Sequence, residues 1–374
     1  MRKKIMIVFG TRPEAIKLCP LVLEFKKHEK IFNTFICVTA QHREMLDQVL
    51  NLFKVTPDID LNIMKSNQTL VDTTILALEK LYGVIQKTKP DLIIVQGDTT
   101  TTFVASLAAY YNKIPVGHVE AGLRTGNKYS PYPEEINRRL TSSIVEIHFA
   151  PTEASRQNLL HEGFSGDQIF VTGNTVIDAL CWAREKIQES PQNYPELEQI
   201  DFTKRIILMT GHRRENFGPS FIEVCKAVKE VATQNDDVEL VYPVHLNPNV
   251  KKTVTTHLSG INNIKLLDPL DYAPFVFLMD KCFFIISDSG GIQEEAPSLG
   301  KPVLVTRDTT ERPEALEAGA VLLVGTDRKK IINESHKLLT DIRYYNSIAQ
   351  VKNPYGDGHA SQYIVDEVKK FLRA

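Results

Sequence analysis

Three acidic residues in the first half of the chain stand at positions that suit proton transfer. Asp98 and Glu120 each follow a short apolar run, and Glu134 begins a helical stretch after Pro131-Tyr132-Pro133. Proton transfer at a carbon atom needs a carboxylate that lies close to the substrate and is partly desolvated, so that its pKa moves toward neutrality. A second acid must serve the opposite face of that carbon. The three residues therefore predict general acid–base chemistry.

Two of these acids also have purely structural explanations. Asp98 could cap a helix that begins at Thr99, and Glu134 with Glu135 could complement the dipole of a first helical turn. No comparable structural role is evident for Glu120. We therefore regard Glu120 as the strongest of the three candidates.

Two glycine-bearing loops could hold a diphosphate. In Gly10-Thr11-Arg12-Pro13, glycine permits close approach of the backbone, and the guanidinium of Arg12 could bind a phosphate. Ser289-Gly290-Gly291 offers bare amides and a hydroxyl at the start of a helix. A tight turn with a solvated arginine and a simple helix cap are the structural alternatives.

Further charged groups follow other apolar runs. Thr210-Gly211-His212-Arg213-Arg214-Glu215 and the segment from Thr309 to Glu314, which contains Arg312, could bring more cations to the same cleft. His212 lies in a polar loop, whereas His118 and His148 lie in apolar runs that are typical of core residues. Glu295 could accept hydrogen bonds from both hydroxyls of a ribose, or could lie on a solvated helix face.

Short apolar runs alternate with stretches of helical period, which predicts parallel sheets covered by helices on both faces. The expected strands are Ile5–Phe9, Phe35–Thr39, Leu92–Val95, Pro115–Val119, Ile147–Ala150, Ile206–Met209, Glu239–Pro243, Phe283–Ser287, Val303–Thr306 and Val321–Val324. The expected helices of the first half span 13–30, 42–53, 70–88, 99–112 and 152–162. The pattern weakens at Glu189–Gln199 and then restarts. The chain is therefore expected to form two doubly wound α/β lobes that face a central cleft, with ligands beyond the carboxyl ends of the strands.

Composition excludes several classes of protein. A chain of 374 residues that is 43% hydrophobic exceeds what one core usually supports, and 44 basic against 46 acidic residues leave no broad basic field for nucleic acid. The five cysteines are widely spaced and odd in number, which argues against disulfides and thiolate metal sites and favours a reducing cytoplasm. The apolar run Phe275–Ile286 is too short to span a bilayer.

Several catalytic motifs are absent from the sequence. It contains neither the dinucleotide motif G-x-G-x-x-G nor the P-loop motif G-x-x-x-x-G-K-[ST], and the nearest approach, Gly356-Asp357-Gly358, follows no expected strand. It also contains neither H-E-x-x-H nor G-x-S-x-G. We therefore expect no bound metal and no nicotinamide cofactor.

Ten blocks spread through both halves of the chain carry a family resemblance. The blocks are FGTRPEAIK, TAQHREMLDQVL, GDTTTT, GHVEAGLRT, YSPYPEEINRR, GNTVIDAL, TGHRRENFG, YPVHLNPNV, DSGGIQEEAPSLGKPV and DTTERPEA. Together they resemble, nearly end to end, the bacterial non-hydrolysing UDP-N-acetylglucosamine 2-epimerases. The resemblance implies a GT-B fold of two Rossmann-like lobes, a cytoplasmic location and usually a homodimer. The first lobe would comprise residues 1–170 with a C-terminal helix at about 359–374, and the second would comprise 171–358.

The resemblance also implies a reaction. Anti elimination of UDP from UDP-N-acetylglucosamine would give 2-acetamidoglucal, and UDP would add again after protonation of the opposite face of C2. The product, UDP-N-acetylmannosamine, would supply cell-surface polysaccharide synthesis, and no cofactor is required.

The matching blocks imply roles for individual residues. Asp98, Glu120 and Glu134 resemble the acid–base group around C2, and His212 resembles the residue that assists the departing diphosphate. The implied UDP ligands are Arg12, Lys17, Phe275, Ser289, Gly290, Gly291, Glu295 and Arg312. A second UDP-N-acetylglucosamine, bound as an activator, would contact Gln41, Arg213 and His245.

Three alternatives share these loops. A GT-B glycosyltransferase would use the same phosphate cradle but would transfer the sugar to an acceptor. A hydrolysing epimerase would release free N-acetylmannosamine and UDP. A sugar-nucleotide sensor would bind without turnover, but it would have no need for three acids.

Overall fold

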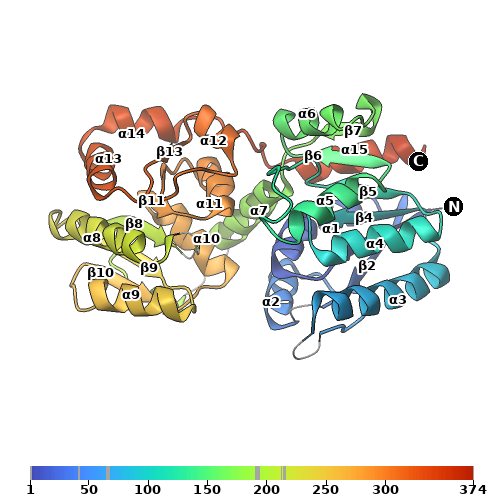
Figure 1. Ribbon diagram of the computed structural model, residues 1–374, viewed down its shortest axis with the longest axis horizontal. Helices are drawn as coiled ribbons and strands as arrows, with labels where there is room; N and C mark the ends of the chain where they lie inside the picture. The colour runs from blue at the N-terminus through green and yellow to red at the C-terminus, as the bar shows by residue number, and fades with distance from the viewer. Residues whose placement is uncertain are drawn as a thin grey trace. The chain divides into compact units, whose positions relative to one another are not determined.

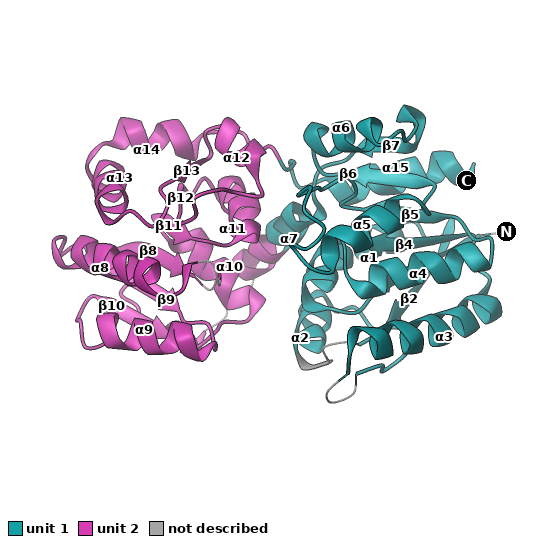
Figure 2. Ribbon diagram, viewed as in Figure 1, with its two compact units in different colours: residues 1–182, 355–374 teal, residues 183–354 magenta. Residues whose placement is uncertain are grey.

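The computed structural model describes residues 2–40, 43–64, 68–189, 194–211, 213 and 216–373. The chain divides into two compact units, shown in teal and magenta in Figure 2. Unit 1 comprises residues 1–182 and 355–374, and unit 2 comprises residues 183–354. The last segment of the chain is therefore part of the unit that the first segment begins.

Unit 1 is built on a seven-stranded parallel sheet with the order β3-β2-β1-β4-β5-β6-β7. Its strands are β1 (Lys3–Phe9), β2 (Phe32–Val38), β3 (Ile59–Asp60), β4 (Leu92–Gln96), β5 (Val116–Val119), β6 (Ile147–Ala150) and β7 (Ile169–Val171). The strand order reverses direction between β1 and β4. In open α/β sheets this reversal is where ligand-binding loops diverge.

Helices connect and cover the strands of unit 1 (Figure 1). They are α1 (Arg12–Lys27), α2 (Arg43–Phe53), α3 (Leu70–Thr88), α4 (Thr100–Tyr111), α5 (Glu134–Ser142), α6 (Glu153–His161), α7 (Thr175–Glu189) and α15 (Ala360–Leu372), with a short 3-10 turn at Gly166–Gln168. The residues of α7 from Ala183 onward belong to unit 2. The C-terminal helix α15 packs against α1. Asp178 of α7 accepts hydrogen bonds from the backbone N–H groups of Ala360 and Ser361 at 3.1 and 2.6 Å, which fixes the first turn of α15.

Unit 2 repeats the plan with a six-stranded parallel sheet in the order β10-β9-β8-β11-β12-β13. The strands are β8 (Arg205–Thr210), β9 (Val238–Pro243), β10 (Ile264–Leu267), β11 (Phe284–Ser287), β12 (Val303–Val305) and β13 (Val321–Leu323). The helices are α8 (Pro219–Thr233), α9 (Pro248–Leu258), α10 (Tyr272–Lys281), α11 (Gly290–Glu295), α12 (Pro313–Glu317), α13 (Arg328–Thr340) and α14 (Ile342–Ala349), with 3-10 turns at Pro195–Leu197 and Ala296–Leu299.

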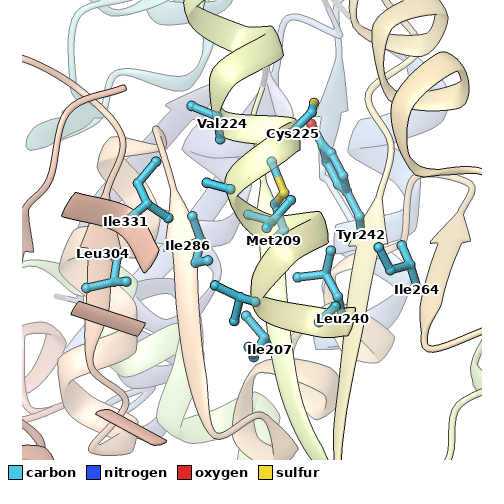
Figure 3. Packing of buried hydrophobic residues seen from close by; sticks show 14 of the residues in the cluster. Ile207, Met209, Val224, Cys225, Leu240, Tyr242, Ile264, Ile286, Leu304 and Ile331 are labelled. Carbon is cyan, nitrogen blue, oxygen red and sulfur yellow. The ribbon is translucent and has the colours of Figure 1, made fainter. Parts of the chain in front are cut away.

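The core of unit 2 lies between this sheet and α8. Figure 3 shows Met209 and Ile286, from adjacent strands, packed near Val224 and Cys225 of α8. Tyr242 is fully buried in this cluster, and its hydroxyl donates a 2.8 Å hydrogen bond to the carbonyl oxygen of Gly211. A core residue, Tyr242, therefore anchors the loop that follows β8.

All ten expected strands are present, with ends that differ by a few residues at most. Three strands were not predicted. These are β3, which has two residues, β7, which has three, and β10 at the edge of the second sheet. β3 and β7 are too short to give a clear apolar run, and Lys265 interrupts the apolar residues of β10, so the local sequence gives a weak strand signal at these three places.

Within the part of the chain that the structure describes, no helix combines the length and the apolar character needed to cross a membrane. The apolar run Phe275–Ile286 is divided between α10 and β11.

Candidate active site

The loop after β1 is organised by Glu14, a buried residue in the first turn of α1. Its Oε2 atom accepts hydrogen bonds from the backbone N–H groups of Gly10 and Thr11 at 3.0 and 2.8 Å, and from the Thr11 hydroxyl at 2.8 Å. Its Oε1 atom accepts hydrogen bonds from the hydroxyls of Thr99 and Thr102 at 2.7 and 3.2 Å. Burial raises the pKa of Glu14, and these hydrogen bonds act in the opposite direction. One side chain thus joins the loops after β1 and β4.

Arg12 is the first residue of α1 and is half-buried. Its guanidinium group makes no hydrogen bond or ion pair with any described residue. A cation with no internal partner at the carboxyl edge of a parallel sheet is available to an anionic ligand.

Glu120 directly follows β5 and has a left-handed backbone, with φ of 64°. Its Oε2 atom forms an ion pair with Nζ of Lys17 and accepts a 3.1 Å hydrogen bond from Nδ2 of Asn174. A left-handed conformation costs a residue other than glycine about 1–2 kcal/mol. Such strain at a candidate functional residue persists only where surrounding contacts hold it.

Asp98 lies in the loop after β4, the strand next to β5. Its carboxylate forms an ion pair with Arg138 of α5, and its carbonyl oxygen accepts a 3.0 Å hydrogen bond from the Asn137 side chain. The structural alternative for Asp98, a cap of the following helix, is excluded. The cap is Thr99, whose hydroxyl accepts a 3.2 Å hydrogen bond from the N–H of Thr102, so the helix begins at Thr100.

Glu134 and Glu135 begin α5 but differ in their environment. Glu135 is buried and accepts hydrogen bonds from the backbone N–H groups of Thr125 and Gly126, at 3.1 and 3.2 Å. It also pairs with Arg138 at 3.3 Å, and thereby holds the cation that Asp98 contacts. Glu134 has a buried Oε2 atom with no hydrogen-bond partner among the described residues. Glu135 is therefore structural, whereas Glu134 has capacity to accept a proton or a hydrogen bond.

The two core histidines predicted from the sequence are buried neighbours on β5 and β6. Nε2 of His118 lies 2.7 Å from the carbonyl oxygen of Gly97, and burial lowers the pKa of His118 to about 4. Burial lowers the pKa of His148 to about 3, and neither of its ring nitrogens has a hydrogen-bond partner among the described residues. Both rings are therefore neutral near pH 7.

In unit 2, the loop after β11 leads into α11 at Gly290, which lies close to Arg213 and Arg312. A Cβ atom added to Gly290 would lie 3.8 Å from the guanidinium of Arg312 and 4.0 Å from Nη2 of Arg213. The backbone N–H of Arg213 donates a 2.9 Å hydrogen bond to Asp288, which ties the loop after β8 to the loop after β11. The bare backbone at Gly290 therefore faces two guanidinium groups, as a phosphate cradle requires.

Acidic residues hold these arginines in place. The buried Glu294 of α11 forms an ion pair with Nε of Arg312. Glu311 lies 3.6 Å from Arg213, and although burial opposes ionisation of Glu311, the neighbouring guanidinium groups hold its pKa below the usual value. The arginines thus have fixed positions before any ligand arrives.

The other predicted ligands of unit 2 lie on the same sheet edge or close to it. The backbone N–H of Ser289 donates a 3.0 Å hydrogen bond to Ser287, and a Cβ atom on Gly291 would lie 3.7 Å from Oε1 of Glu295. Phe275 is half-buried on α10. His245 is exposed after β9, and its Nδ1 accepts a 3.1 Å hydrogen bond from the N–H of Asn247.

Two predicted residues, Gln41 and His212, lie outside the described residues. Other residues that organise the loops were not singled out from the sequence, namely Glu14, Arg138, Asn174 and Glu294. Only Glu14 had a local signal, because Thr11 to Glu14 fits the capping-box pattern that the structure contains. The partners of the remaining three lie between 18 and 54 residues away along the chain, where no short-range pattern could identify them.

Two Rossmann-like units with charged loops at the carboxyl edges of their sheets define the GT-B class of enzymes that act on nucleotide sugars. Residues 24–369 match the family model described as UDP-N-acetylglucosamine 2-epimerase. The sequence is 56% identical to UDP-N-acetylglucosamine 2-epimerase of Yersinia pestis and 55% identical to that of Escherichia coli K12, each over 98% of both chains. The crystal structure of UDP-GlcNAc 2-epimerase from Neisseria meningitidis bound to UDP-GlcNAc superposes with a TM-score of 0.90 and 52% identity, covering 98% of this chain and 100% of that one.

The chain therefore belongs to the UDP-N-acetylglucosamine 2-epimerase family and is an isomerase with a GT-B fold. The fold class and the bacterial family predicted from the ten sequence blocks are confirmed.

Proposed function

We propose that this protein is the non-hydrolysing type of 2-epimerase and reversibly interconverts UDP-N-acetylglucosamine and UDP-N-acetylmannosamine. The observation that carries the proposal is the pair of carboxylates on neighbouring loops of unit 1. Glu120 is paired with Lys17, and Asp98 is paired with Arg138. The substrate follows from the Neisseria meningitidis relative, whose crystal structure contains UDP-GlcNAc.

The nucleotide half of the substrate fits the loops of unit 2. The diphosphate would lie against the backbone at Ser289, Gly290 and Gly291, beneath Arg213 and Arg312. Bidentate contacts between arginine and phosphate combine charge with fixed geometry. Glu295 would accept the ribose hydroxyls, and Phe275 would lie beside the uracil ring.

The sugar half undergoes elimination followed by addition. A carboxylate removes the proton from C2 while the bond between C1 and the UDP oxygen breaks, which leaves 2-acetamidoglucal and UDP. A second acid then protonates the opposite face of C2, and the UDP oxygen re-forms its bond to C1. The elimination and the addition together change neither the atoms nor the oxidation state of the substrate, so the reaction needs no oxidant or reductant.

We assign this proton transfer to Asp98, Glu120 and Glu134 together. Glu120 forms an ion pair with Lys17, and Asp98 forms an ion pair with Arg138. Glu134 supplies an unpartnered oxygen at the start of α5. Lys17 and Arg12 would contact the departing diphosphate, and His212 would assist its departure.

The product would supply N-acetylmannosamine units for cell-surface polysaccharides.

We further propose that two copies associate through α3, which exposes Val71, Ile75 and Tyr82 on one face while α4 packs against another. Exposed apolar side chains at helical spacing are typical of interfaces. Sedimentation of the Ile75→Glu variant as a monomer, against a wild-type dimer, would support this arrangement.

A second UDP-N-acetylglucosamine could act as an activator through Gln41, Arg213 and His245. Arg213 has a buried Nε with no partner among the described residues, which leaves it capacity to bind a further anion. Obligatory activation predicts a lag, or no turnover, when UDP-N-acetylmannosamine is the only substrate. Hyperbolic kinetics with UDP-N-acetylglucosamine and immediate conversion of UDP-N-acetylmannosamine would show that turnover requires no activator.

Product analysis separates this function from its alternatives. Purified protein should convert UDP-N-acetylglucosamine to a stable mixture with UDP-N-acetylmannosamine when no acceptor, metal or nicotinamide is added. Free N-acetylmannosamine with stoichiometric UDP would indicate the hydrolysing enzyme. Dependence on an added acceptor would indicate a glycosyltransferase, and binding without turnover would indicate a sensor.

A further inference from the structure

We propose that Asn174 is a positioning residue that fixes the orientation of the Glu120 carboxylate and tunes its proton affinity. This inference rests on the proposed role of Glu120 in proton transfer. Asn174 lies in the loop between β7 and α7, is only 2% exposed, and is 54 residues from Glu120 along the chain.

Asn174 forms hydrogen bonds through its backbone N–H and through both ends of its side-chain amide. Its backbone N–H donates to the carbonyl oxygen of Tyr355 at 2.7 Å, and its Oδ1 accepts from the N–H of Val176 at 3.1 Å. Its Nδ2 donates to Oε2 of Glu120 at 3.1 Å. Because Oδ1 is anchored to Val176, the amide cannot rotate, and its donor remains directed at the carboxylate.

The backbone around Asn174 is built for a close approach of two chain segments. Gly173 has φ of 86°, and a Cβ atom added there would lie 3.2 Å from the carbonyl oxygen of Tyr355. Gly356 has φ of 127°, and a Cβ atom there would lie 3.3 Å from Cα of Gly173. Two glycines therefore let the segment that re-enters unit 1 at Tyr355 pack directly against the loop that carries Asn174.

Lys17 and Asn174 contact the same oxygen of Glu120. Two fixed donors on one oxygen define the plane of a carboxylate and hence the direction of its second oxygen. His118 on β5 also interacts electrostatically with Glu120, but its ring is neutral near pH 7. Asn174 is thus a neutral donor beside the cationic Lys17, and it can orient the carboxylate without adding a second cation.

The variant Asn174→Asp isolates this contact. An aspartate keeps the backbone hydrogen bond to Tyr355 and the acceptor for Val176, but it replaces the donor to Glu120 with a carboxylate oxygen. Like charges about 3 Å apart disfavour ionisation of both groups. We expect kcat/KM to fall at least tenfold at pH 7, and the acidic limb of its pH profile to move upward by about one pH unit.

Asn174→Ser is the second variant, because serine can retain a hydroxyl acceptor for Val176 but cannot reach Glu120. It should lower kcat at least tenfold with little change in the affinity for UDP, and with a smaller shift of the pH profile. Asn235→Asp, at a half-buried asparagine of unit 2 whose Nδ2 bonds the carbonyl oxygen of Val231, is the matched control and should keep wild-type kinetics.

The outcomes distinguish a positioning role of Asn174 from a purely structural role and from failure of the proposed function. An unshifted pH profile in folded Asn174→Asp, or unchanged kcat in folded Asn174→Ser, would overturn the positioning role. Lower thermal stability with wild-type kcat per folded molecule would also overturn it, because it would show a structural role only. If the wild-type protein itself fails to epimerise UDP-N-acetylglucosamine, the proposed function fails independently of Asn174.

Discussion

Lys17 of α1 and Glu120 after β5 form an ion pair although 103 residues separate them in the sequence, and both side chains are largely shielded from solvent. Removing one partner of such a pair leaves an uncompensated charge, which is costly. The pair therefore fixes the geometry between the start of α1, where Arg12 lies, and the end of β5. The ion pair therefore holds Arg12, the expected diphosphate ligand, in a fixed position relative to Glu120, the expected proton acceptor.

Replacement of Glu120 by glutamine should abolish most turnover without preventing nucleotide binding. The change removes one charge and one proton acceptor, and the phosphate cradle in unit 2 is untouched. Loss of a general base typically costs about 10²- to 10⁴-fold in rate. Initial rates and UDP titration calorimetry would measure the two effects. Glu153→Gln, at an exposed residue of α6, serves as the control, and near-normal turnover of Glu120→Gln would exclude Glu120 from the mechanism.

Replacement of Arg12 by alanine should weaken UDP binding rather than destabilise the protein. Arg12 has no partner among the described residues, so its removal leaves no internal group unpaired. A charge-assisted contact to phosphate contributes about 1.5–3 kcal/mol, which corresponds to a roughly 10- to 150-fold higher Kd. Arg156→Ala removes a surface arginine that pairs with Glu153 and should leave Kd unchanged. An unaltered Kd in Arg12→Ala would mean that Arg12 does not contact the ligand.

Replacement of Gly290 by alanine tests the phosphate cradle directly. The added methyl group would sit 3.8 Å from Arg312, which is ordinary contact, so the fold should tolerate it. It would nevertheless occupy space between the backbone and the guanidinium groups, and we expect UDP affinity to fall at least tenfold. Gly83→Ala is a matched control in α3, where no atom lies within 4 Å of the added Cβ. That control should raise stability by about 0.5–1 kcal/mol and leave UDP affinity unchanged. Wild-type affinity in Gly290→Ala would place the diphosphate elsewhere.

His148 should make unit 1 sensitive to acid. The pKa of its ring is about 3 in the folded protein, against an ordinary value of 6.5, so only the unfolded chain takes up the proton as the pH falls below 6.5. The free energy of unfolding should therefore decrease by about 2 kcal/mol from this residue between pH 7 and pH 5.

The variant His148→Leu, of similar volume, should reduce this loss and retain stability at pH 7. Trp182 is the sole tryptophan of the sequence, lies in unit 1 and stacks on Phe53, so its fluorescence in urea would follow the transition. Equal acid sensitivity in the two proteins would contradict the assignment of this proton uptake to His148.

Local patterns in the sequence predict the sheets of both units and the positions of the charged loops, because long apolar strands and the glycines that follow them are short-range features. The sequence alone leaves the alternative role of Asp98 as a helix cap open, because Asp98 and Thr99 are adjacent and both residue types cap helices. Arg138, Asn174 and Glu294 could not be identified, since each acts through a partner that only the fold brings near. The chemistry at C2 came from the family resemblance and not from spacing or composition.

The most direct test of the proposed function is a proton NMR time course of the purified protein with UDP-N-acetylglucosamine in deuterated water, without acceptor, metal or nicotinamide. Elimination and re-addition through 2-acetamidoglucal predict that UDP-N-acetylmannosamine accumulates to a constant ratio and that deuterium enters at C2. Unchanged substrate, free sugar as the only product, or epimer that retains its C2 proton would contradict proton exchange by Asp98, Glu120 and Glu134.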